Sequence, residues 1–124
     1  MQAQERRRRR GTTITQSLQF QLAACCEDGQ IDAMVVADDS GVPLASSGDP
    51  SACDEVAARM VLVGTRIREF NGVLLGHGHR WDVQMKKIDL QGSDLLVCAV
   101  GGTAEARQRQ IARGAAGAAR ILAA

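Results

Sequence analysis

The sequence predicts an α+β fold in which three helices pack on one antiparallel sheet of five strands. Apolar residues recur at helical spacing in three segments, residues 12–28, 51–70 and 103–122. Two short apolar runs separate the first two segments and three separate the last two, which is typical of strands. The chain has 124 residues, of which 45% are hydrophobic, enough for one ordinary core. The expected order is therefore helix, two strands, helix, three strands, helix, within a single domain.

The first helix is predicted for residues 12–28, and Gly29 supplies its end. One face of this helix is apolar at helical spacing: Ile14, Leu18, Leu22 and Cys25. Residues 31–37 then form a β-branched, mostly apolar strand that closes in the turn sequence Asp-Asp-Ser-Gly at 38–41. A second strand follows over residues 42–46. Because Pro43 has no N–H to donate, this strand is expected at an edge of the sheet.

The second helix is predicted to begin with Ser51 as its N-cap and to end near Phe70. The stripe expected to face the sheet is Val56, Met60, Val63, Ile67 and Phe70. The apolar arc is wider than one face, however, since it also includes Cys53, Ala57, Val61 and Gly64, with Leu62 nearly opposite. A helix this apolar needs a second covering surface.

Two interpretations of the wide arc remain open. In the first, a second copy of the chain covers it, and the dimer interface consists of Ala57, Val61, Gly64 and Leu62, with small residues that let two helices approach closely. In the second, the first or third helix of the same chain covers this flank.

Arg59 and Arg66 lie seven residues apart on one side of the same helix. They are candidate residues for binding a partner, although a solvated helix face explains them equally well.

The last half of the chain is predicted to contain three strands and a helix. Residues 73–75 open the first strand, and apolar residues alternate from Trp81 onward. The alternation changes phase at Lys86-Lys87, where a β-bulge would keep both apolar sets on the core side. Residues 94–100 are apolar at nearly every position, which predicts a central strand covered on both faces. In the final helix, Gly114 and Gly117 indicate close backbone packing.

The net charge of +1 conceals an asymmetry, because five of the 15 basic residues are Arg6 to Arg10. Residues 1–11 are therefore expected to form a disordered, Arg-rich tail outside a domain of residues 12–124. The alternative is that the tail acts as a weak electrostatic tether to a membrane or to nucleic acid. The three aromatic residues are too few to build a base-stacking platform.

The element order, together with the sequence Ile-Asp-Ala-Met-Val-Val-Ala-Asp-Asp-Ser-Gly-Val-Pro-Leu-Ala-Ser-Ser-Gly at residues 31–48, resembles the roadblock/dynein light chain family. The resemblance spans about residues 14–122, and its specific part is residues 31–48. It implies a roadblock/profilin-like five-stranded sheet, and a homodimer in which two sheets join at an edge while the second helices pack together. It further implies a regulator without chemistry of its own that binds Ras-like small GTPases and modulates their hydrolysis cycle, or associates with motor or scaffold complexes. The alternative is a structural dimerisation or scaffold module with a basic tether and no GTPase partner.

The sequence carries only weak matches to catalytic and metal-binding motifs, so we expect no enzyme activity, no cofactor and no metal. No phosphate-binding loop of the Gly-x-x-x-x-Gly-Lys-Ser/Thr type is present. His77 and His79 alternate on a strand but are too few for a metal site.

The sequence favours a cytoplasmic location. The small-residue pattern at Leu22 to Cys25 suits lipoprotein cleavage, but the preceding segment is too polar for a secretory signal. The four cysteines are accordingly expected to be reduced and buried.

Overall fold

A computed structural model describes residues 2–76 and 78–123, with side chains from residue 13 onward. The elements follow the expected order: α1 (Gln2–Gly29), β1 (Ala33–Asp38), β2 (Pro43–Ser47), α2 (Pro50–Gly64), β3 (Glu69–Gly76), β4 (His79–Leu90), β5 (Ser93–Val100) and α3 (Ala104–Ala123). The five strands form one sheet in the order β2-β1-β5-β4-β3, and every pair is antiparallel. The α+β prediction is confirmed.

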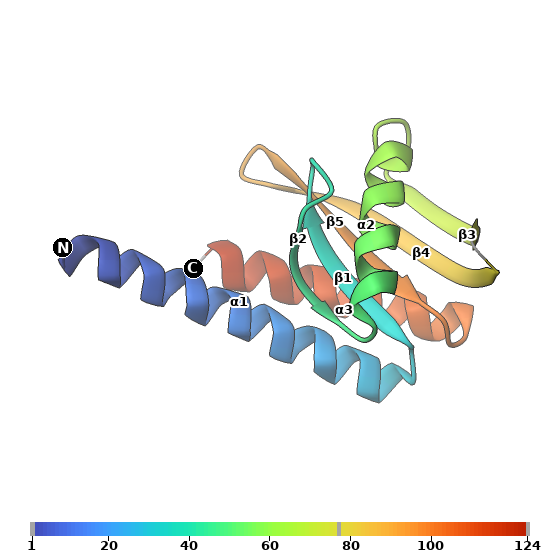
Figure 1. The fold of residues 1–124 in the computed structure, drawn as a ribbon, viewed down its shortest axis with the longest axis horizontal. Coiled ribbons are helices and arrows are strands. Elements are labelled where there is room, and N and C mark those ends of the chain that lie inside the picture. Colours follow the sequence, from blue (N-terminus) through green and yellow to red (C-terminus); the bar gives the residue numbers. More distant parts are fainter. Residues whose placement is uncertain (1, 77, 124) are drawn as a thin grey trace.

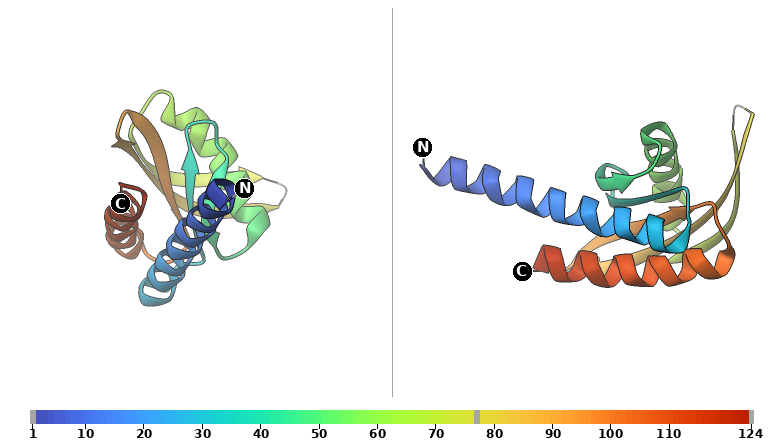
Figure 2. Two further views of the ribbon diagram at one scale, coloured as in Figure 1. Left: turned by 90° about the vertical axis from the view of Figure 1, so that its left-hand side faces the viewer. Right: turned by 90° about the horizontal axis from the view of Figure 1, so that it is seen from below.

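The sheet separates two helical layers (Figure 1). α2 lies on one face, and α1 and α3 lie side by side on the other, as Figure 2 shows from two further directions. Each layer has its own core cluster, one beneath α2 and one beneath α1 and α3. Within the described residues, no helix combines the length and the apolarity needed to cross a membrane.

β5 is the central strand, as its sequence predicts. All six residues from Leu95 to Val100 are buried. Alternate side chains enter opposite clusters, because successive residues of a strand point to opposite faces. Pro43 lies in β2 at the edge of the sheet, opposite Ala37, where the β1–β2 register shifts. The missing N–H of Pro43 therefore disturbs only an outer ladder.

The predicted bulge at Lys86-Lys87 is wrong. β4 pairs with β5 without any register shift from Val83 to Leu90. The alternation of apolar residues changes phase because the two halves of β4 pack against different helical layers. Val83 and Met85 enter the cluster beneath α2, whereas Ile88 and Leu90 pack against the cluster beneath α1 and α3.

Both predicted ends of α2 are also corrected. Asp49 is the N-cap in place of Ser51, and its Oδ2 accepts a hydrogen bond from the Ala52 N–H at 3.3 Å. The helix ends at Gly64, not near Phe70, and Phe70 lies in β3. Phe70 still packs against the cluster beneath α2. The helical spacing of apolar residues thus extended from α2 to Phe70 although the chain had already changed to a strand, which is why the predicted helix was too long.

α1 and α3 approach each other closely, as the glycines of α3 indicate. A Cβ atom at Gly117 would lie 2.5 Å from the side chain of Gln21 on α1. One at Gly114 would lie 3.2 Å from Cε of Met34 on β1, so α3 also lies close to the sheet. The buried face of α1 contains Leu18, Leu22 and Cys25, as expected.

The backbone of residues 2–11 continues α1, whereas the sequence favours a disordered tail there. Arg, Gln and Ala are good helix formers, so a helix already formed by the packed residues extends into them at low cost. This part of α1 projects past α3 and the sheet (Figure 1).

Asp38 fixes the turn between β1 and β2. Its Oδ1 accepts hydrogen bonds from the Ser40 N–H at 2.9 Å, the Ser40 hydroxyl at 2.6 Å and the Val42 N–H at 3.0 Å. The hydrogen bonds from the Ser40 hydroxyl and the Val42 N–H lower the pKa of this carboxyl group below its ordinary value.

We predict that Asp38→Ala lowers the free energy of unfolding by about 1 kcal/mol at pH 7, measured by urea denaturation. Because the folded-state pKa is lowered, this stabilisation is present above the unfolded-state pKa of about 3.9. It is lost as the pH falls through the folded-state value, so the difference between wild type and variant should shrink in acid. Asp39→Ala in the same turn is the control and should have little effect. Equal losses in the two variants would contradict the role of Asp38.

Candidate interaction surface

The free edge of β3 and the outer side of α2 form one exposed surface, which we call the α2–β3 surface. β3 is the last strand of the sheet, and within the described residues only β4 pairs with it. Among the described residues, Leu62 (70% exposed) lies on α2 and Ile67 (44%) lies on the turn after it. Val73 (38%) and Leu75 (65%) lie on β3, with side chains that point to the face of the sheet opposite α2. An unpaired strand edge with apolar side chains is a template for another strand.

The structure separates the four residues expected at a dimer interface. Ala57 and Gly64 are buried on the side of α2 that faces the sheet. A Cβ atom at Gly64 would lie 2.9 Å from the side chain of Leu96 on β5. Val61 is half-buried and faces Gly41 in the β1–β2 turn. Only Leu62 is well exposed.

The chain's own sheet therefore covers the part of the apolar arc of α2 that contains Ala57 and Gly64. Because α1 and α3 lie on the other face of the sheet, the interpretation in which they cover this flank is wrong. Leu62 stays exposed and Val61 half-buried, so a contact between two copies there stays a prediction. Ala57 and Gly64 are small because α2 lies close to its own strands.

Arg59 contacts the edge strand of its own chain. Its Nη1 donates a hydrogen bond to the Leu75 carbonyl at 2.7 Å, so α2 is tied to the end of β3. Glu55 lies beside the same point, since a Cβ at Gly76 would lie 3.6 Å from its carboxylate. Arg59 is half-buried in this arrangement.

Arg66 does not share a helix with Arg59, because α2 ends at Gly64. It lies in the turn that follows, where its N–H donates to the Val63 carbonyl at 3.0 Å. Its side chain is exposed and forms no ion pair within the part of the chain that the structure describes. Of the two arginines, Arg66 is the more accessible to a partner.

Lys87, which the sequence did not single out, fixes the end of α2. Its Nζ donates to the Gly64 carbonyl at 2.8 Å and pairs with the Asp94 carboxylate at 3.3 Å. A cation at a helix C-terminus is favourable, and this side chain is only 18% exposed. The turn that carries Arg66 and Ile67 is therefore anchored at its helical end.

No family model matches the sequence, and no characterised protein matches it at the sequence level. Solved structures do match its fold. A structure described as MglB with a tetrameric arrangement has a TM-score of 0.64 at 15% identity, covering 87% of this chain and 89% of that one. The gliding protein MglB from Thermus thermophilus has a TM-score of 0.61 at 16% identity, with 87% and 90% covered. A Roadblock/LC7 domain from Streptomyces avermitilis has a TM-score of 0.55 at 15% identity, with 86% and 98% covered.

The chain has a roadblock fold. The resemblance stated from residues 31–48 is thereby confirmed at the level of the fold. In this roadblock fold those residues form β1, β2 and the turns that follow each strand.

The groups considered for chemistry are dispersed over the roadblock fold. His79 stacks on Trp81 with ring centroids 5.4 Å apart, and Trp81 packs against the cluster beneath α2. His77 lies outside the described residues. Among the residues described, no three His, Cys, Asp or Glu side chains gather as metal ligands would.

The four cysteines are free thiols. Burial raises the pKa of Cys25, Cys26 and Cys53, and raises that of Cys98 to about 12. Each thiol is therefore protonated at neutral pH, which disfavours a nucleophilic role.

We predict different effects for the two arginines. Arg59→Met should lower the free energy of unfolding by about 1 kcal/mol, because the variant loses a charge-assisted hydrogen bond at a partly solvated site. Arg66→Met, the matched control, should leave stability unchanged. Urea denaturation of both variants measures this, and equal stabilities would show that Arg59 does not tie α2 to β3.

Proposed function

We propose that this chain is a non-catalytic, homodimeric regulator or adaptor that binds a Ras-like small GTPase in the cytoplasm and modulates its cycle of GTP hydrolysis. The observation that carries the proposal is the roadblock fold shared with MglB over most of both chains. The absence of a phosphate-binding loop from the sequence supports a regulator in place of a GTPase. The proposal needs no cofactor and no metal.

The free edge of β3 supports the dimer. It is eight residues long, and antiparallel pairing with the same edge of a second copy is isologous, so it closes the assembly. Leu62, Ile67 and Leu75 are the apolar side chains best placed for this contact. As candidates for the dimer interface they take the place of Ala57 and Gly64, which are already covered by the sheet of the same chain. One of the similar structures is described as a tetrameric arrangement, which also favours self-association.

The proposed mechanism is positional. A dimer that holds the switch loops of a GTPase in their GTP-bound arrangement orders the catalytic groups of the GTPase and adds none of its own. Arg66, in the exposed turn after α2, would make this contact. Arg59 is assigned a structural role, because it already binds the Leu75 carbonyl.

We predict a dimer at micromolar concentration that Leu75→Glu weakens at least tenfold. A charged side chain at a paired edge must lose water when the two copies associate. Val42→Glu is the matched control, since Val42 is similarly exposed but lies in the β1–β2 turn. Sedimentation equilibrium measures both constants. A wild-type monomer at these concentrations would remove the physical basis of the shared binding platform.

We predict that the chain captures a Ras-like GTPase more strongly in its GTP-analogue form than in its GDP form. Arg66→Ala should weaken capture several-fold without changing the dimer. Equal capture of both nucleotide forms would contradict the regulatory proposal.

The same experiment tests the alternative, a scaffold tethered through Arg6 to Arg10, which the projection of α1 beyond the sheet favours (Figure 1). Deleting residues 2–11 should leave GTPase capture intact. Binding that disappears on this deletion and weakens steeply with salt would instead support the basic tether.

A further inference from the structure

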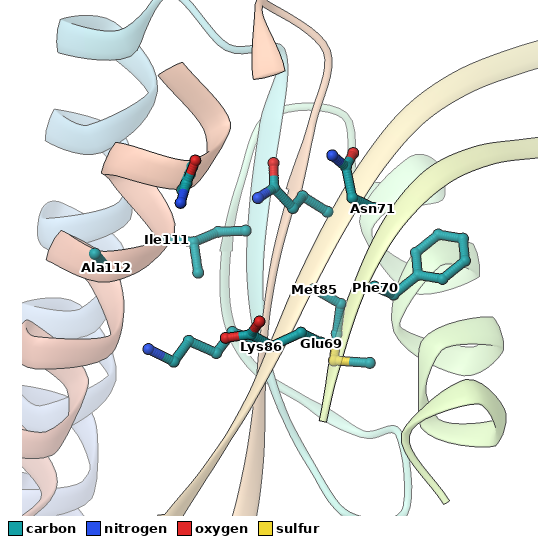
Figure 3. A pocket seen from close by; sticks show the side chains of 9 residues that line it. Glu69, Phe70, Asn71, Met85, Lys86, Ile111 and Ala112 are labelled. Atoms are coloured by element: carbon teal, nitrogen blue, oxygen red, sulfur yellow. The ribbon is translucent and has the colours of Figure 1, made fainter. Parts of the chain in front are cut away.

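A cavity of about 320 Å³ lies on the sheet face opposite α2, between α3 and the β3–β4 hairpin (Figure 3). It exists because α3 packs along β4 and β5 and does not extend over β3. Side chains from β3, β4 and α3 line it. Its volume is at the lower end of the range for ligand sites, enough for one side chain and the peptide groups beside it.

Three carboxamides from three different elements line this cavity: Asn71 of β3, Gln84 of β4 and Gln108 of α3. Asn71 and Gln84 are direct partners in the β3–β4 register. Gln84 Oε1 is buried and has no hydrogen-bond partner among the described residues. A buried acceptor without a donor is uncommon and costs stability, so a bound group that donates to it would be favoured.

The charges at the cavity cancel. Glu69 and Lys86 are partners in the same register, and both side chains line the cavity. They form no ion pair in the part of the chain described. Ile111 and Ala112 of α3 supply an apolar wall. A ligand with a large net charge, such as a nucleotide or a nucleic acid, finds no excess of opposite charge here.

The open face of β3 extends the cavity. Residues 69, 71, 73 and 75 share one side of the strand, because side chains alternate along it. Glu69, Asn71 and the exposed Val73 therefore form a track that continues from the cavity, whereas Leu75 beyond it belongs to the proposed dimer contact. The cavity and this track together suit an elongated ligand.

We propose that this cavity binds an extended, uncharged peptide segment of a partner protein, with one aliphatic side chain against Ile111. A carboxamide presents the same donor and acceptor as a peptide group, so Asn71, Gln84 and Gln108 match the main chain of an extended segment. A helical segment pairs its own main-chain groups and has no free N–H for Gln84 Oε1.

The site is independent of the proposed GTPase contact, because α2 lies on the other face of the sheet (Figure 2). A peptide segment in the cavity and a partner on the outer side of α2 can therefore bind at the same time. This arrangement would give the chain two separate docking faces.

The test uses N-acetyl-leucine N-methylamide, one residue flanked by two peptide groups, as the probe in an NMR titration of the full chain. The side-chain amide signals of Asn71, Gln84 and Gln108 should shift and saturate with a dissociation constant of about 1 to 10 mM, the affinity expected for a ligand of this size. N-acetyl-alanine N-methylamide should bind about tenfold more weakly, because it lacks most of the aliphatic side chain. Shifts that do not saturate, or equal binding of the two probes, would overturn the proposal.

Ala112→Arg should abolish the saturable shifts by filling the mouth of the cavity. Ala116→Arg is the matched control, because Ala116 is equally exposed one turn later on α3 and does not line the cavity. Gln84→Leu should weaken the leucine probe about tenfold while the variant stays folded. If Ala112→Arg binds the probe as wild type does, the cavity is not the site.

Discussion

Burial of β5 on both faces is the constraint on which the rest of the structure depends. Leu96, Cys98 and Val100 must be covered by α2, while Leu95, Val97 and Ala99 must be covered by α1 and α3. A strand that is apolar on every position cannot lie at an edge or at the surface. The chain therefore needs helices on both sides of a sheet whose centre is its own last strand.

That constraint also explains where the molecule remains open. One helix covers one face, and it packs mainly against β1, β2 and β5. The two helices on the other face extend only as far as β4. β3 is consequently left with a free edge and a partly uncovered face, and both proposed binding regions lie along this strand. The uncovered surface along β3 is thus a consequence of how few helices the chain has for five strands.

Most of the fold could be predicted from local sequence because apolar spacing, proline and glycine act locally. The central position of β5, the edge position of Pro43 and the close contact at Gly117 all follow from such signals. The errors arose where a local pattern has two tertiary explanations. The phase change at Lys86-Lys87 fits a bulge or a strand serving two cores, and only the packing of β4 decides between them.

Less of the interaction surface could be predicted. The apolar arc of α2 was recognised, but the rotation of the helix about its axis is set by the sheet beneath it, which buries Ala57 and exposes Leu62. The exposed residues of the edge were missed, although the sequence from Phe70 to Leu75 carries the signal of a strand. The cavity could not be foreseen, because Gln84 and Gln108 are 24 positions apart in the chain.

The antiparallel packing of α1 and α3 brings both ends of the polypeptide to one side of the molecule, with β3 on the opposite side (Figure 1). An affinity tag, a fluorescent protein or a second natural domain fused at either end would thus emerge away from the open strand. Immobilising the protein through either end should leave both proposed docking faces accessible to the surrounding solution.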